Sequence, residues 1–238
     1  STTFLGAHVF PIEYQGREDE YLFTMCQQWI PQLAQAQLID AVDVFCEPSA
    51  FGLSMAKTLF DVAKHHQLKV KMHAEQLSNQ HGAALAASYQ ALSADHLNYL
   101  DEPGVKALAN NNTVAVLLPL THYYLQANQF PPVSLLRDNH VDIAIASDYN
   151  AGSSPMLSLL LAANMACIRF GLSAEEALKG ITLNAAKALN VQDDEGALVV
   201  GKVANMIVWN ITAPRDICVQ FGLPQIYQRI YKGKITQA

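Results

Sequence analysis

The sequence predicts an α/β protein built from parallel βα units. Short apolar runs alternate with segments of helical periodicity from the N-terminus to Asp148, an order typical of parallel sheets whose strands are joined by helices. The runs end at positions 8, 47, 73, 96, 119 and 148, which are 39, 26, 23, 23 and 29 residues apart. A (β/α)8 barrel averages about 31 residues per unit, so this spacing fits a TIM-like barrel.

Six apolar runs are the expected strands: 3–7, 41–46, 69–72, 91–94, 113–118 and 141–147. Six parallel strands could form an open doubly wound sheet, or a barrel that lacks its first two strands. An open sheet usually carries a glycine-rich phosphate loop after its first strand, whereas Gly6 stands alone. The chain starts at Ser1 and enters a strand within three residues, so we expect it to be a piece of a longer protein.

The expected helices lie between and after these strands. Pro31 should break or kink the first helix, Pro103 suits the first turn of the fourth, and Ser173 with Glu176 has the spacing of a capping box. The expected helical ranges are 20–38, 54–66, 77–89, 102–110, 156–170 and 173–190.

The pattern becomes β-like from Gly196 onward. Residues 197–210 predict two short strands that turn about Gly201-Lys202, and residues 229–235 predict a final strand. We therefore expect two domains. The first is the βα domain over residues 1–195, whose strands would be strands 3 to 8 if it is a barrel without its first two, and the second is the C-terminal part of a small β domain over residues 196–238.

Composition limits the possible classes of function. Apolar residues make up 51% of the chain and charged residues 15%, which favours a sizeable core. The net charge of −6 and the absence of a basic run argue against nucleic-acid binding. The four cysteines show no CxxC spacing, and the chain has neither a signal-peptide pattern nor an uninterrupted 18-residue apolar run. We expect a cytoplasmic protein with no membrane partner.

Three acid–base residues follow expected strands: His73, His96 and Asp148. Such positions face the mouth of a barrel or open sheet, where α/β enzymes keep their chemistry. Two imidazoles and a carboxylate suit a divalent transition metal and its activated water. A polar cap on a core strand is the alternative for each residue alone, but the three together favour a site. We expect His73 and Asp148 to bind metal, Asp148 also to accept a proton, and His96 to carry protons unless it is a further ligand.

Polar neighbours of these residues are candidates for substrate binding. Either Glu75 or Gln76 could orient a water or hold a substrate amide, and Glu75 could instead face solvent at a helix N-terminus. Asp95 precedes His96, so only one of this pair is expected to point into the mouth. His122 follows another strand and is a possible pocket residue.

The segment after Asp148 could also contact a ligand. Gly152 allows close backbone approach, and Asn150 and Ser153 offer paired donors and acceptors for a planar polar substrate, although an ordinary turn has the same composition. The sequence contains no GxSxG motif and no nucleophilic cysteine context, which argues against a covalent hydrolase.

Four motifs together resemble the imidazolonepropionase family of the metal-dependent amidohydrolase superfamily: T-F-L-G-A-H-V-F-P-x-E-Y, K-M-H-A-E-Q, S-A-D-H and A-S-D-Y-N-A-G-S-S-P. The resemblance runs over nearly the whole chain. It implies a (β/α)8 barrel with a composite β-sandwich. It also implies hydrolysis of the ring C–N bond of 4-imidazolone-5-propanoate to N-formimidoyl-L-glutamate, and it points to a homodimer.

The resemblance also implies roles for particular residues. One zinc or iron ion would be held by a His-x-His pair together with His73 and Asp148, and His96 would assist proton transfer. No H-x-H sequence occurs in this chain. The positions that match the family's substrate-binding residues are His8, Gln76, Asn150, Gly152 and Ser153.

Two other functions remain open from the sequence. A deaminase of a nucleobase-like ring in the same superfamily would use a glutamate after the third metal ligand, where this chain has Glu75. A non-catalytic fragment, folding only with a complementary N-terminal piece, would explain the missing H-x-H sequence.

Overall fold

The computed structural model describes residues 1–220, 222 and 225–236. Its main sheet has six strands in chain order, and the pairs β1–β2, β2–β3 and β3–β4 are parallel. A doubly wound sheet reverses its strand order at a switch point, whereas a barrel sheet does not. The strand order therefore confirms the expected α/β class of barrel type. The strands are β1 (Thr3–Ala7), β2 (Ala41–Cys46), β3 (Lys69–Ala74), β4 (Ser93–His96), β5 (Val114–Leu117) and β6 (Ile143–Ile145).

The chain folds as two compact units, which are described separately below. The first comprises Ser1–Ala115 and Gln129–Val141, and the second comprises Val116–Asn128 and Asp142–Ala238. The expected boundary between residues 195 and 196 remains a prediction.

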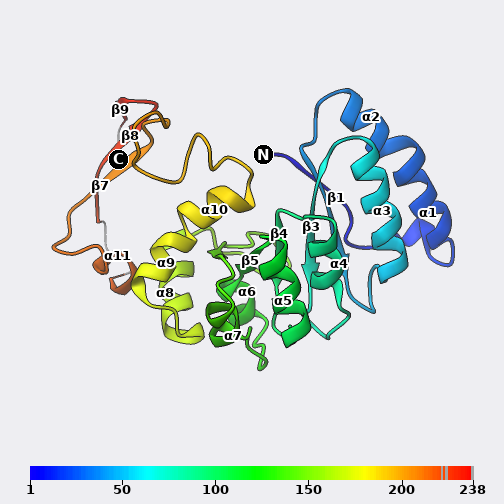
Figure 1. Ribbon diagram of the computed structural model, residues 1–238, viewed down its shortest axis with the longest axis horizontal. Helices are drawn as coiled ribbons and strands as arrows, with labels where there is room; N and C mark the ends of the chain where they lie inside the picture. The colour runs from blue at the N-terminus through cyan, green and yellow to red at the C-terminus, as the bar shows by residue number, and fades with distance from the viewer. Residues whose placement is uncertain (221, 223–224, 237–238) are drawn as a thin grey trace. The chain divides into compact units, whose positions relative to one another are not determined.

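In the first unit, helices cover the strands that they connect (Figure 1). Helix α3 (Leu53–His65) packs on β2, and α4 (Gly82–Ser88) packs on β3 and β4 and against α5 (Glu102–Asn110). Helix α3 buries Ala56, Leu59, Phe60 and Ala63, which share one face because they are three or four residues apart. A Cβ atom at Gly82 would lie 2.9 Å from the sulfur of Met72, so a glycine lets α4 approach the sheet closely.

The first expected helix is interrupted near Pro31, as predicted. It consists of α1 (Glu18–Thr24), a π-helical turn (Met25–Trp29) and α2 (Ile30–Gln35). Proline has no amide hydrogen to donate to the preceding turn, and its ring crowds the carbonyl four residues earlier, so the regular hydrogen-bond ladder is broken there.

The helix predicted over residues 77–89 begins later in the structure, so the prediction of its start is wrong. Helix α4 starts at Gly82, because the loop before it is held by a buried carboxylate. Glu47 accepts hydrogen bonds from the amides of Gln76 and Leu77 at 2.8 and 2.9 Å and from the Ser78 hydroxyl at 2.7 Å. These interactions stabilise a non-helical conformation.

The second unit contains the expected capping box. The Ser173 hydroxyl accepts from the Glu176 amide, and the Glu176 carboxylate accepts from the Ser173 amide, at the start of α9 (Ala174–Gly180). The prediction of a single helix over residues 173–190 is wrong, because Thr182 is not helical and a separate helix, α10 (Leu183–Ala188), follows it. Asn184 of α10 donates to the Ile143 carbonyl, which ties this helix to β6. Among the described residues the second unit also contains α6 (Pro119–Tyr124), α8 (Leu159–Phe170) and α11 (Asp216–Val219). The first unit also contains α7 (Val133–Asp138) and a short 3-10 helix (Ile12–Tyr14).

A separate antiparallel sheet lies within the C-terminal segment. It comprises β7 (Met206–Trp209), β8 (Ile226–Tyr231) and β9 (Lys234–Thr236). In place of the single strand expected over 229–235, β8 and β9 form a hairpin. Lys232 and Gly233 between them both have positive φ angles, 49° and 75°, that suit a tight turn. The strand expected at 197–200 is absent: the amides of Lys202 and Val203 bond to the carbonyls of Val199 and Asp194, so turns replace a ladder.

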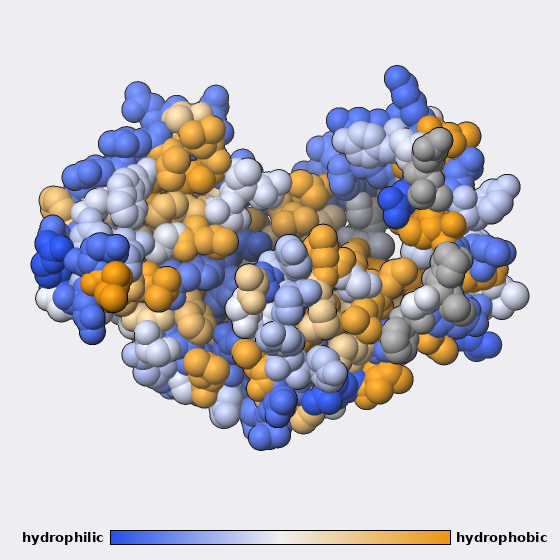
Figure 2. Space-filling model, turned by 180° about the vertical axis from the view of Figure 1, so that it is seen from behind, coloured by the Kyte–Doolittle hydropathy of each residue, from blue (hydrophilic) through white to orange (hydrophobic). Residues whose placement is uncertain are grey.

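The surface mixes polar and apolar side chains. Figure 2 shows apolar residues interspersed with hydrophilic ones on one face of the molecule. Within the described residues, no helix has both the length and the apolar character needed to cross a bilayer.

Candidate active site

Three strands of the first unit bring chemically active side chains together. His8 follows β1 directly, Asp43 lies in β2, and His73 is the penultimate residue of β3. The strand register pairs Phe45 with His73 and His73 with Asp95. Paired residues of a parallel sheet share a face, and so do residues two apart on one strand, so Asp43, Phe45, His73 and Asp95 occupy the same face.

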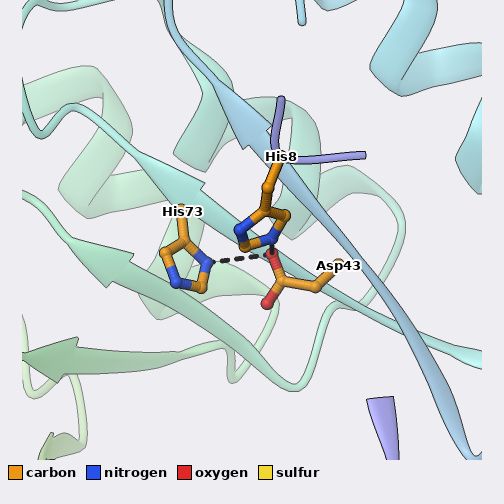
Figure 3. A group of neighbouring side chains, drawn as sticks. All are labelled: His8, Asp43 and His73. Atoms are coloured by element: carbon orange, nitrogen blue, oxygen red, sulfur yellow. Dashed lines mark hydrogen bonds and ion pairs between the residues drawn. The ribbon is translucent and has the colours of Figure 1, made fainter. Parts of the chain in front are cut away.

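A single carboxylate oxygen connects two of the histidines (Figure 3). Asp43 Oδ1 lies 2.9 Å from His73 Nδ1 and 3.1 Å from His8 Nε2, and the two imidazole rings meet edge to face at 4.6 Å between centroids. These three side chains form one group with the ligand types and spacing for a metal ion. Asp43 was not predicted from the sequence, although an acid within the apolar run A-V-D-V-F-C was an available signal.

Opposing effects act on the pKa of the buried Asp43 carboxyl. Burial alone would raise the pKa of its carboxyl, but the charges and hydrogen bonds of His73 and His8 outweigh this effect and hold the pKa well below its usual value. Since Asp43 engages Nδ1 of His73, metal binding by His73 would use Nε2.

His96 and Asp95 both lie beside His73. The His96 ring is 5.2 Å from the His73 ring, and Asp95 Oδ2 is 3.8 Å from His73 Nδ1. Both neighbours therefore lie beside the same histidine, and which of them faces the mouth remains a prediction. Strand alternation would place them on opposite faces, but His96 has a φ of 75° and Leu97 a φ of 64°, and this left-handed backbone redirects the chain.

Burial shifts the pKa of both residues. His96 is 5% exposed, and burial together with the neighbouring His73 lowers its pKa well below the usual value, so its imidazole is neutral at neutral pH. Burial raises the pKa of Asp95, whose Oδ1 atom has no hydrogen-bond partner among the described residues.

Glu75 does not belong to this group. Its carboxylate accepts hydrogen bonds from the amides of Gly82 and Ala83, at 2.7 and 2.9 Å, at the start of α4. It is fully buried rather than exposed to solvent, and burial raises its pKa. The carboxylate that a deaminase would need is thus committed to a helix N-terminus, whereas the side chain of Gln76 is half-buried.

The second unit positions the remaining expected site residues. Asp148 has a φ of 52°, and its Oδ2 accepts a hydrogen bond from the Thr121 hydroxyl at 2.6 Å. Asn150, Gly152 and Ser153 lie in one turn. The Asn150 side-chain oxygen accepts from the amides of both Gly152 and Ser153, at 2.9 and 2.7 Å, so it holds the turn itself.

His122 is buried, and its expected place in a pocket remains a prediction. It is 3% exposed, and its ring packs edge to face on Phe170 of α8, with 5.1 Å between centroids.

Comparison with known proteins identifies the family to which this chain belongs. A model described as "Amidohydrolase family" matches residues 4–237, so the chain belongs to the amidohydrolase family. Among solved structures, an adenosine deaminase from Xanthomonas campestris with bound zinc superimposes with a TM-score of 0.75 at 21% identity, over 97% of this chain and 59% of that one. At this identity the likeness shows the fold alone.

Curated relatives within the class are more similar. An imidazolonepropionase of Cupriavidus pinatubonensis is 49% identical over 237 residues, covering 100% of this chain and 56% of the relative. One of Aliivibrio salmonicida is 46% identical over 235 residues, covering 99% of this chain and 58% of the relative. The chain thus spans somewhat more than half the length of these relatives.

Proposed function

We propose that this chain is part of an imidazolonepropionase, which hydrolyses the ring C–N bond of 4-imidazolone-5-propanoate to N-formimidoyl-L-glutamate in histidine degradation. The observation that carries the proposal is the 46–49% identity to proteins of this name across the whole chain. The cluster of His8, Asp43 and His73 supports it, because both histidines lie at the C-terminal ends of strands, where barrel enzymes hold their catalytic groups. The enzyme would be a homodimer, as its resemblance to the family implies, and would work in the cytoplasm, as expected from the sequence.

The residues present fit one divalent transition metal, zinc or iron. Asp43 orients His73, and the carboxylate of Asp148 is oriented by Thr121, which are the supports that metal ligands usually have. Imidazole and carboxylate ligands suit both metals. When bound, the metal would act as a Lewis acid and lower the pKa of water. The resemblance assigns the further ligands to a His-x-His pair.

The remaining residues would bind substrate and move protons. A buried neutral imidazole at His96 can accept a proton from the attacking water and return it to the ring nitrogen as the C–N bond breaks. Asp148 is a second proton acceptor. His8, Gln76 and the turn formed by Asn150, Gly152 and Ser153 would contact the ring and its ring-opened product.

The test uses the intact protein that contains this chain. The purified protein is incubated with 4-imidazolone-5-propanoate, and N-formimidoyl-L-glutamate is measured by mass spectrometry before and after removal and return of zinc or iron. We expect turnover that disappears with the metal and returns with it. Adenosine in a parallel reaction tests the deaminase alternative through release of ammonia. Ammonia release without imidazolone hydrolysis would reject the proposal.

A further inference from the structure

We propose that Asp43 is a positioning residue that orients both His73 and His8 through one carboxylate oxygen. It thereby supports metal binding through His73 and substrate contact through His8. This inference rests on the proposed function for the roles of the two histidines, and on the structure for the connection between them.

The geometry determines which nitrogen of each imidazole carries a proton. One carboxylate oxygen faces a nitrogen of each imidazole and serves as the acceptor for both, so the nitrogen that faces it is the donor. His73 therefore carries its proton on Nδ1, and a neutral ring then presents the lone pair of Nε2 to a metal. His8 likewise carries a proton on Nε2, and its neutral ring presents the lone pair of Nδ1. That atom can accept a hydrogen bond from a ring N–H of the substrate.

The carboxylate of Asp43 is more deeply buried than either histidine, as expected of a residue that orients the other two. The side chain of Asp43 is 3% exposed, that of His73 is 19% exposed and that of His8 is 26% exposed. Asp43 lies within β2, paired with Lys71 of β3, whereas His8 lies just beyond the end of β1. The hydrogen bond from His8 to Asp43 thus fastens a residue outside the strands to the rigid sheet. A rigid buried acceptor with two partly exposed donors is suited to orientation rather than to direct contact with substrate.

The same three atoms could instead hold a metal by themselves, and the two arrangements predict different results. If Asp43 positions His73, replacing His8 leaves metal affinity unchanged. If the three residues are themselves the ligands, replacing His8 weakens metal binding as much as replacing Asp43 does.

The experiment combines Asp43→Ala, Asp43→Asn, His8→Ala and the double variant His8→Ala/Asp43→Ala in the intact protein. Zinc affinity is measured by competition with a chelator, and KM and kcat are measured on the metal-loaded protein. Because loss of a partner that orients a metal ligand typically costs about 10–100-fold in affinity, we expect Asp43→Ala to weaken zinc binding by that factor and to raise KM. Asp43→Asn keeps an acceptor oxygen at the same place and should recover part of both losses.

The double variant separates the two effects. His8→Ala should raise KM without changing zinc affinity, and adding Asp43→Ala to it should weaken zinc binding but raise KM little further. Leu108→Ala, a buried change in α5, is the control for loss of stability alone and should change neither quantity.

Unchanged zinc affinity in Asp43→Ala would overturn the inference, and so would weakened zinc binding in His8→Ala. If Asp43→Ala does not fold, equal zinc affinities of Asp43→Leu and Asp43→Asn would overturn it. If the wild-type protein does not hydrolyse the imidazolone, the proposed function fails, but the zinc measurements still decide whether Asp43 positions His73.

Discussion

Local backbone strain places His96 in the candidate site. A non-glycine residue with a φ of 75° is uncommon, and such a conformation costs on the order of 1–3 kcal/mol and persists only where the surrounding structure enforces it. Here it brings two consecutive residues, Asp95 and His96, to the same histidine, which strand alternation alone forbids. The strain thus gives the site a buried neutral imidazole next to the proposed metal ligand.

His96→Ala is expected to lower kcat while the metal stays bound. A general acid–base contribution is typically about 10²–10⁴-fold, and His96 is proposed to carry protons rather than to bind metal. Steady-state kinetics and metal analysis of the same preparation provide the measurement. Loss of metal from this variant would identify His96 as a ligand.

His73→Ala and Asp148→Ala are each expected to remove most of the bound metal and the activity. Each substitution deletes one of about four ligands. Elemental analysis of the intact protein after dialysis tests this, with Tyr99→Phe, a change on a partly exposed side chain, as a control for handling. Full metal occupancy in either variant would contradict the assignment of that residue.

Two buried glutamates organise the segment between β3 and α4. Glu47 holds the amides of Gln76 and Leu77, and Glu75 holds the first amides of α4. Carboxylates favour helix N-termini because the unsatisfied amides there carry partial positive charge. The side chain of Gln76 is therefore left half-buried, while the two glutamate side chains stabilise the fold.

Glu75→Ala is expected to change the stability of the protein, whereas Gln76→Ala is expected to change substrate binding. Glu75→Ala leaves two amide donors without their acceptor and should lower the free energy of unfolding by at least about 2 kcal/mol. Gln76→Ala should change stability by less than roughly 0.5 kcal/mol and should instead raise KM. Chemical denaturation and kinetics on both variants test the pair. If the Glu75→Ala protein is as stable as the wild type but has a reduced kcat, Glu75 acts in the active site and the prediction is wrong.

At the scale of the molecule, the main sheet has an accessible edge. Among the described strands, β1 pairs with β2 alone, and its Leu5 side chain is 56% exposed. Edge strands offer unpaired amides and carbonyls to other chains, and a lysine on such a strand opposes association.

The polypeptide Ser1–Ala238 expressed by itself is therefore expected to self-associate. We also expect it to show no imidazolone hydrolysis, because it contains no H-x-H sequence to complete the metal site. Leu5→Lys should shift it toward smaller species, because a charge on β1 disfavours pairing between edges. Leu38→Lys, at a similarly exposed leucine outside the strands, should not. Size-exclusion chromatography with light scattering measures both. A wild-type monomer that hydrolyses the substrate would refute this expectation.

The fold class could be predicted from the sequence because its signals are local. The apolar runs at Thr3–Ala7 and Ala41–Cys46 coincide with β1 and β2, and residues 102–110 coincide with α5. Periodicity and capping act within a few residues, so they can be read along the chain. The start of α4 could not, because it depends on Glu47, which hydrogen-bonds to residues 29 to 31 positions away.

The sequence by itself determined which residue types are available for chemistry, including His73, His96 and Asp148, and the motifs that relate the chain to its family. Only the tertiary structure decided how they are used. Asp43 meets His73 and His8 across 30 and 35 residues of chain, and that contact depends on the packing of three separate segments against one another. Glu75 follows His73 by two positions, yet it caps a helix instead of facing the site, because the left-handed backbone at Glu75 turns its carboxylate toward the buried amides of α4.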